Sequence, residues 1–328
     1  MERRQFLAAA GAAVLLPVPK ALADDMTDPN TLPRQAPVHV GTVGLLTRDA
    51  EALAAYYRRV VGLTETGRAG NTIWLGAAST PLLALTEAEG LSLAPQASAG
   101  LYHTAFLLPS RADLARWVGM ASMDRLPVDG ASDHLVSEAI YLTDPEGNGI
   151  EIYADRPQAG WDWTGGQVRM ATEAPNVPDL MAELGPVPLP WQGAPAGTMI
   201  GHVHLKVGDA EQGAAWWTGQ MGFDRVRARR GAVFLSTGGY HHHVAVNEWQ
   251  SRGAGRVAGR AAFPRRGGRD AGRLVRPAMG VALLSPGGRR TAGRRRPRRR
   301  PRRRRAPPRC AAAGCTWRPA RSGRARRS

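Results

Sequence analysis

Histidines and one glutamate are the residues of this chain that could carry out chemistry. Seven of the eight histidines in the 328 residues fall between positions 103 and 243. An isolated histidine is more often a packed or surface residue than a ligand, but imidazole and carboxylate side chains together can hold a borderline divalent cation. The candidates, in chain order, are His103, His134, Glu151, His202, His204 and the run His241, His242 and His243.

The stretch 100–157 has a pattern that would position three of these candidates. An apolar run between Gly100 and Pro109 predicts a strand. A capping serine follows, and apolar residues at helical spacing come after it. The predicted order is strand 101–108, helix 110–120, loop 127–132, strand 135–143, turn 144–149 and strand 150–154.

The last of these strands shows a strict alternation. Ile150 and Ile152 share one face, whereas Glu151 and Tyr153 share the other. We therefore expect a sheet whose apolar face meets the helix and whose opposite face holds the carboxylate.

The same pattern occurs three times along the chain. The segment GTVGL, DAE and AAYY from Gly41 aligns without gaps with GHVHL, DAE and AAWW from Gly201. The middle copy places His103 in the position that His202 holds in the third, whereas the first copy has Thr42 there. The sequence predicts three βαβββ modules: module one (37–90), which is structural, and modules two (100–157) and three (198–255), which carry the metal site.

These segments resemble the vicinal oxygen chelate superfamily of glyoxalases, bleomycin resistance proteins and extradiol dioxygenases. The most specific pieces are IGHVHLKVGD, DHLVSEAIYLTDPEGNGIEIY and GGYHHHVAVNEW. Within that superfamily they are most similar to the type I extradiol dioxygenases of the catechol 2,3-dioxygenase kind. The resemblance covers residues 37 to about 255 and implies an α+β fold of βαβββ modules arranged as half-barrel sheets. Such enzymes normally have four modules, and three are found here.

The resemblance also implies a metal centre. Its ligands would be His103, His202 and Glu151, and its metal Fe(II), with Mn(II) as the alternative. Two histidines and one carboxylate leave open positions on the metal, which suits a non-haem Fe(II) oxygenase. The partners implied are a small aromatic diol and dioxygen.

Three further residues receive catalytic roles from the resemblance. His242 matches the histidine that acts as acid and base on the bound catechol. His134 matches a histidine that hydrogen-bonds the substrate or oxygen, and Tyr141 matches a tyrosine of the pocket. Strand parity groups His242 with Val244, but His243 with Ala245. It therefore leaves open which of His241, His242 and His243 faces the cavity.

The ends of the chain and the segment 158–197 have a different character. Residues 1–25 have the twin arginine, short apolar stretch and small residues of an export signal, which predicts a periplasmic or secreted protein. If translation starts at Met26, the protein is cytoplasmic. The segment 158–197, rich in proline, glycine and tryptophan, is interpreted as a linker whose Trp161 and Trp163 pack over the first half of the molecule, with a solvated spacer as the alternative.

The C-terminal part, 256–328, contains 25 arginines, no lysine and one acidic residue, whereas the whole chain has a net charge of +17. This composition predicts disorder. We interpret it as the product of a G+C-rich gene translated in a shifted frame, because it begins where a fourth module should start. The alternative is a genuine arginine-rich arm that binds nucleic acid.

The sequence thus predicts an Fe(II)-dependent extradiol dioxygenase. The alternative is an inactive or binding-only chelate-fold protein that lacks an intact fourth module. Neither a nucleic-acid partner nor a membrane span is expected, and assembly into a homo-oligomer is left open.

Overall fold

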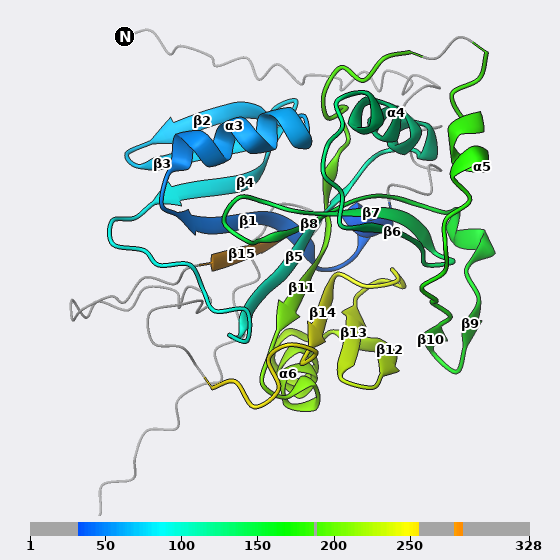
Figure 1. Ribbon diagram of the computed structural model, residues 1–328. Helices are drawn as coiled ribbons and strands as arrows, with labels where there is room; N and C mark the ends of the chain where they lie inside the picture. The colour runs from blue at the N-terminus through cyan, green and yellow to red at the C-terminus, as the bar shows by residue number, and fades with distance from the viewer. Residues whose placement is uncertain (1–31, 187–188, 256–278, 285–328) are drawn as a thin grey trace, which may run out of the picture. The chain divides into compact units, whose positions relative to one another are not determined.

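Three βαβββ units follow one another along the chain (Figure 1). The computed structural model describes residues 32–186, 189–255 and 279–284. After a short helix α2 (Leu32–Gln35), the first unit comprises β1 (His39–Thr47), α3 (Ala50–Val60), β2 (Thr64–Ala69), β3 (Thr72–Ala77) and β4 (Thr80–Glu87). The second comprises β5 (Gly100–Leu107), α4 (Arg111–Met123), β6 (Gly130–Asp133), β7 (Ser137–Thr143) and β8 (Gly149–Asp155). The third comprises β11 (Met199–Lys206), α6 (Ala210–Trp216), the π-helix η3 (Trp217–Met221), β12 (Asp224–Arg229), β13 (Ala232–Ser236) and β14 (Val244–Asn247).

The strands pair in the same way in all three units. Each first strand runs parallel to the last strand of its own unit, as β1 does to β4, β5 to β8 and β11 to β14. The second and third units join through an antiparallel pair, β5 and β11, into one eight-stranded sheet of order β12-β13-β14-β11-β5-β8-β7-β6. The α+β class with repeated βαβββ units is therefore confirmed.

Equivalent residues precede and follow the helical segments of the first and third units. Asp49 and Asp209 cap α3 and α6, each accepting a hydrogen bond from the backbone N–H three residues later. Gly62 and Gly222 follow these helices with φ of 78° and 73°, a conformation that favours glycine. These shared features support the sequence alignment of the two units.

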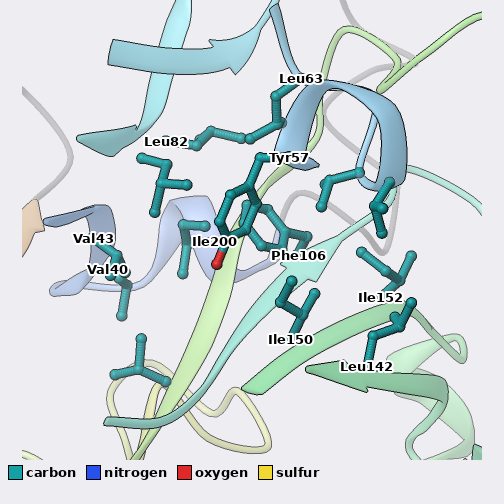
Figure 2. Close-up of a cluster of buried hydrophobic side chains, with 14 of the residues drawn as sticks. Val40, Val43, Tyr57, Leu63, Leu82, Phe106, Leu142, Ile150, Ile152 and Ile200 are labelled. Atoms are coloured by element: carbon teal, nitrogen blue, oxygen red, sulfur yellow. The ribbon is translucent and has the colours of Figure 1, made fainter. Parts of the chain in front are cut away.

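The helices pack on the faces of the strands that point away from the histidines. Ile150 and Ile152 of β8 belong to a buried cluster that also contains Trp117 of α4, as their alternation predicted. Figure 2 shows part of this cluster, in which Tyr57 of α3 and Phe106 of β5 lie together. Their rings are 6.2 Å apart. One apolar core therefore supports both sheets.

Trp117 is the residue through which we expect this core to be most easily damaged. Its side chain is fully buried, and its indole N–H donates to the carbonyl of Val60 at 2.8 Å. Trp117→Ala should lower the free energy of unfolding by about 3–5 kcal/mol, because a cavity forms and a buried carbonyl loses its donor. Met123→Ala, at an exposed position of the same helix, should change it by less than about 0.5 kcal/mol. Urea unfolding followed by circular dichroism measures both, and equal effects would contradict the packing described.

Two sequence predictions about local structure were wrong. The expected loop 127–132 contains the start of β6, whose four residues have no apolar run to reveal a strand. In the C-terminal part, Met279–Leu284 form β15, which pairs antiparallel with β1 and extends the first unit into a sheet of order β15-β1-β4-β3-β2. The expectation of disorder fails for these six residues because MGVALL is apolar and free of arginine. The rest of 256–328 and the predicted signal 1–25 lie outside the described residues.

The segment 158–197 is not a solvated spacer. It forms η2 (Gln158–Gly160), β9 (Trp163–Thr164), β10 (Gln167–Val168) and α5 (Val177–Ala182). Trp161 is buried in a cluster with Phe234 and Tyr240 of the third unit, whereas Trp163 is exposed. The expectation that both tryptophans cover the first half of the molecule is therefore wrong, because the apolar surface that receives Trp161 belongs mainly to the third unit.

Candidate metal centre and active site

Two histidines and a glutamate meet on one face of the eight-stranded sheet. In the register of the strands, His202 of β11 lies opposite Ala105 of β5, and Ala105 lies beside Glu151 of β8. Residues in register share a face of the sheet. The methyl group of Ala105 leaves room for the longer side chains on either side to reach one another, and a carboxylate oxygen of Glu151 lies 3.2 Å from Nε2 of His202.

The neighbouring row of the sheet adds two more histidines. His204 of β11 lies opposite His103 of β5, which lies beside Gly149 of β8. A Cβ atom at Gly149 would come within 2.3 Å of the carbonyl oxygen of Tyr102, so this position requires glycine. The close approach of β8 to β5 sets Glu151 beside His103, and the same carboxylate oxygen is 3.0 Å from Nε2 of His103.

These donor atoms fit a single metal ion. The Nε2 atoms of His103 and His202 are 3.4 Å apart, and the Glu151 oxygen lies 3.0 and 3.2 Å from them. Two ligands at right angles around an ion about 2.1 Å from each would be about 3 Å apart. The three atoms therefore suit one face of a coordination sphere. The ring nitrogens of His103, His202 and His204 also lie within 4.8 Å of one another, so His204 is an alternative ligand.

The electrostatics of the cluster favour the ligand forms of its residues. Burial lowers the pKa of His202 to about 4 despite the nearby Glu151 carboxylate. The pKa of His204 is also well below its usual value, through burial and the neighbouring histidines. Burial alone would raise the pKa of Glu151, but His202 and His103 hold it well below the usual range. Neutral imidazole and ionised carboxylate are the forms that bind metal.

Ala105 is expected to be essential to this arrangement because of its size. Ala105→Leu would place a branched side chain between His202 and Glu151 and should prevent metal binding, at a cost to folding of about 1–3 kcal/mol. Ala105→Ser adds a single atom and should retain metal. Metal content after dialysis, with thermal melting as the folding control, distinguishes the two. Full metal content in a folded leucine variant would contradict the geometry.

His134 and Tyr141 form a hydrogen-bonded pair beside the glutamate. Tyr141 of β7 lies in register with Glu151, and its hydroxyl is 2.6 Å from Nε2 of His134. Nδ1 of His134 is 2.7 Å from the carbonyl oxygen of Ala171, which can only accept. In a neutral ring Nδ1 therefore carries the proton, and the Tyr141 hydroxyl donates to Nε2. Burial, followed by the charge of Glu151, raises the pKa of Tyr141 well above its usual value.

The three consecutive histidines point in three directions. His242 contacts His204, with 3.3 Å between their Nε2 atoms, and its ring centroid lies 4.1 Å from that of His202. Nε2 of His241 is 2.9 Å from a carboxylate oxygen of Asp155, whereas Nδ1 of His243 is 3.1 Å from the hydroxyl of Ser236. All three precede β14, which begins at Val244. Strand parity was therefore a poor guide to them, because it was applied to residues before the strand.

A cavity of about 740 Å³ opens over the cluster. Every residue that the sequence assigned to the site lines it, namely His103, His134, Tyr141, Glu151, His202 and His242. His204 lines it too, whereas His241 and His243 are not among its lining residues. Apolar and aromatic side chains complete the wall, including Leu101, Tyr102, Met170, Phe234 and Trp249.

Sequence reasoning counted His204 among the candidate residues but gave it no role. The spacing of His202 and His204, two positions apart on β11, was the signal that could have indicated its place in the site. Ala105 and Asp155 were also missed, and they have no such signal, because their importance arises only from the pairing of distant strands.

Comparisons with known proteins agree with this fold. Residues 38–152 match the Glyoxalase/Bleomycin resistance protein/Dioxygenase superfamily. A protein from Bacillus subtilis (strain 168) named catechol-2,3-dioxygenase is 39% identical over 224 residues, which cover 66% of this chain and 76% of that protein. The chain belongs to this superfamily. Its repeated βαβββ units are the vicinal oxygen chelate fold that the sequence motifs indicated.

Solved structures were also compared with the chain. One from Bacillus subtilis subsp. subtilis str. 168 has a TM-score of 0.45 at 14% identity and covers 65% of this chain, which spans 64% of that protein. A glyoxalase/dioxygenase from Nostoc punctiforme has a TM-score of 0.32 at 20% identity, covering 36% of this chain and 90% of its own. A variant of glyoxalase I from Zea mays has a TM-score of 0.39 at 13% identity, and the match covers 71% of this chain and 73% of that protein.

Proposed function

We propose that this protein is an extradiol dioxygenase, which opens a catechol-like ring by adding both atoms of dioxygen. The observation that carries the proposal is the three-atom cluster of His103, His202 and Glu151 at the base of a largely apolar cavity. The 39% identity to a protein named catechol-2,3-dioxygenase supports it.

The metal in this proposal is Fe(II), with Mn(II) as the alternative. An ion held by these three residues would supply Lewis acidity toward a chelated diol and open positions where the diol and dioxygen meet. The remaining work falls to the chain itself. The aromatic side chains Tyr102 and Phe234 offer surfaces against which a ring can pack.

Proton transfer is assigned to His242, and hydrogen bonding to the pair His134 and Tyr141. Nε2 of His242 points toward the cluster, so it can take a proton from a hydroxyl of the diol and return it to the product. Burial and the neighbouring histidines hold the pKa of His242 well below its usual value, which favours the neutral base. The phenol of Tyr141 stays protonated and donates to Nε2 of His134, so its oxygen can accept a hydrogen bond from a substrate hydroxyl.

Oxygen uptake on catechol tests the proposal directly. The full chain, reconstituted with iron(II) under anaerobic conditions, should bind about one ion per chain and consume one O₂ per catechol. With ¹⁸O₂, mass spectrometry should find two labelled atoms in the ring-opened product. Tight metal binding without oxygen uptake on any catechol would favour a binding-only protein instead, and one labelled atom would exclude dioxygenation.

The cavity also suggests which catechols bind best. Arg229 lines it, with its guanidinium carbon 5.1 Å from the centroid of Phe234, whose ring lies 5.1 Å from that of His242. Among the described residues no carboxylate forms an ion pair with Arg229. Burial, followed by the neighbouring Arg227, lowers the pKa of Arg229. An anionic ring substituent would supply the missing partner.

We therefore expect catechols that carry a carboxylate to have a lower KM than catechol itself. Arg229→Gln should raise the KM for the carboxylated ring about tenfold to a hundredfold, the worth of a charged hydrogen bond, and leave the KM for catechol unchanged. Lys206→Gln is the matched control, because the ammonium of this cavity-lining residue already donates to the carbonyl of Gln96 at 2.9 Å. Equal KM changes for both substrates would contradict the assignment.

A further inference from the structure

A buried aspartate and histidine lie behind His242, outside the cavity lining. Asp155 is at the end of β8, four residues after Glu151, and its side chain is 1% exposed, as is that of His241. Nε2 of His241 is 2.9 Å from Oδ1 of Asp155, and its Nδ1 is 2.7 Å from Nδ1 of His242. The three side chains thus form a continuous hydrogen-bonded chain that ends in the cavity.

The ring of His241 is fixed on both sides. Its centroid is 4.1 Å from that of Tyr240 and 5.2 Å from that of Trp161, both of them buried. The hydroxyl of Tyr240 is in turn held by the hydroxyl of Tyr153 at 2.7 Å. His241 therefore has little freedom to rotate away from either Asp155 or His242.

The order of donors and acceptors along this series of hydrogen bonds is set by the carboxylate of Asp155 at its end. An ionised carboxylate can only accept a hydrogen bond, so Nε2 of His241 is protonated and donates to Asp155. In a neutral ring, Nδ1 of His241 is then an acceptor, and the hydrogen bond at 2.7 Å requires a proton on Nδ1 of His242. The other nitrogen of His242, Nε2, then carries a lone pair, and it is the nitrogen on the cavity side, 3.3 Å from Nε2 of His204.

We propose that Asp155 and His241 are positioning residues that hold the imidazole of His242 with its lone pair directed at the substrate. The proposal rests on the role of His242 as base in the proposed function. It explains why a carboxylate and an imidazole are buried together where neither touches the cavity. A buried polar pair of this kind is otherwise costly, since both groups must be desolvated.

Asp155→Asn tests the assignment with little change in shape. The amide of asparagine can donate to Nε2 of His241, which permits the reverse order of protons and leaves Nε2 of His242 protonated. We expect kcat for catechol to fall at least about tenfold. The fall should be no larger than in His242→Phe, which removes the whole contribution of the base, about 10²–10⁴-fold. KM and iron content should stay unchanged, because neither residue touches the substrate or the metal.

A double-mutant cycle separates positioning from a merely structural role. In the His242→Phe background, Asp155→Asn should have no further effect on kcat, because the residue through which it acts is gone. A further fall of equal size in that background would overturn the proposal. Thermal melting of each variant identifies any loss of activity that comes from unfolding.

Histidine tautomers in the wild-type chain provide a readout that needs neither activity nor a variant that folds. In the protein loaded with diamagnetic zinc(II) and labelled with ¹⁵N-histidine, long-range ¹H–¹⁵N spectra should show the proton of His242 on Nδ1. A proton on Nε2, or a doubly protonated His241, would overturn the proposal. If the wild-type chain does not turn over catechol, the proposed function fails, and the tautomer result still decides the geometry.

Discussion

Replacing Glu151 by alanine is expected to abolish iron binding and, with it, oxygen uptake. The carboxylate is buried and lies within 3.2 Å of Nε2 of both His103 and His202, so it would be a direct ligand of an ion held between them. Loss of a residue that orients a ligand already costs about 10–100-fold in metal affinity, and loss of the ligand itself should cost more than about a hundredfold. Equilibrium dialysis with iron(II), followed by metal analysis, measures the change.

His204→Ala is the matched control for this experiment. His204 lies in the same cluster and is equally buried, but in the proposed site it is not a ligand. We expect His204→Ala to keep its iron, with affinity within about threefold of the wild type. The opposite pattern, with iron lost in His204→Ala and kept in Glu151→Ala, would show that three histidines hold the metal. His103→Ala and His202→Ala should lose iron under either arrangement.

Replacing His242 by phenylalanine should lower kcat by about 10²–10⁴-fold while iron content stays the same. The phenyl ring keeps the packing against His202 and Phe234 but removes the nitrogen that would accept the substrate proton. Because His242 is assigned no part in binding the diol, KM should change little. Steady-state oxygen consumption at equal iron content measures both constants.

The neighbouring histidine provides the control. His243 is buried and belongs to the same run of three, but it contacts Ser236 and Thr237 and does not line the cavity. Burial, followed by the neighbouring His241, lowers the pKa of His243 to about 3. His243→Gln should lower thermal stability and leave kcat within about threefold. A larger loss of kcat in this variant than in His242→Phe would move the base to the other position.

Much of the fold and part of the site could be predicted because their signals are local. The alignment of Gly41 with Gly201 identified repeated units, and the alternation around Glu151 indicated its face of the sheet. The repeat also drew attention to His103 and His202, which the structure brings within 3.4 Å of each other. Each of these signals lies within one strand or in a comparison of short matching segments.

The remaining features depend on which strands are neighbours. Ala105 matters because β5 lies between β11 and β8, and no pattern within β5 reveals that order. Asp155 and His241 are 86 positions apart and meet only after two units have paired. β15 was missed although its signal is local, because this short apolar segment lies within an arginine-rich part of the sequence. Its pairing partner, β1, is more than 200 residues earlier in the chain.

The candidate ligands lie on strands in the middle of the eight-stranded sheet, whereas part of the cavity wall comes from a loop. Seven residues of 91–99, in the connection between β4 and β5, line the cavity, and none belongs to a helix or strand. Connections of this kind tolerate substitution and insertion better than central strands do. If the proposed function holds, the shape of the accepted ring can therefore change through this loop during divergence of related genes while the metal ligands are inherited intact. Exchanging this loop between relatives would then transfer substrate preference without transferring metal preference.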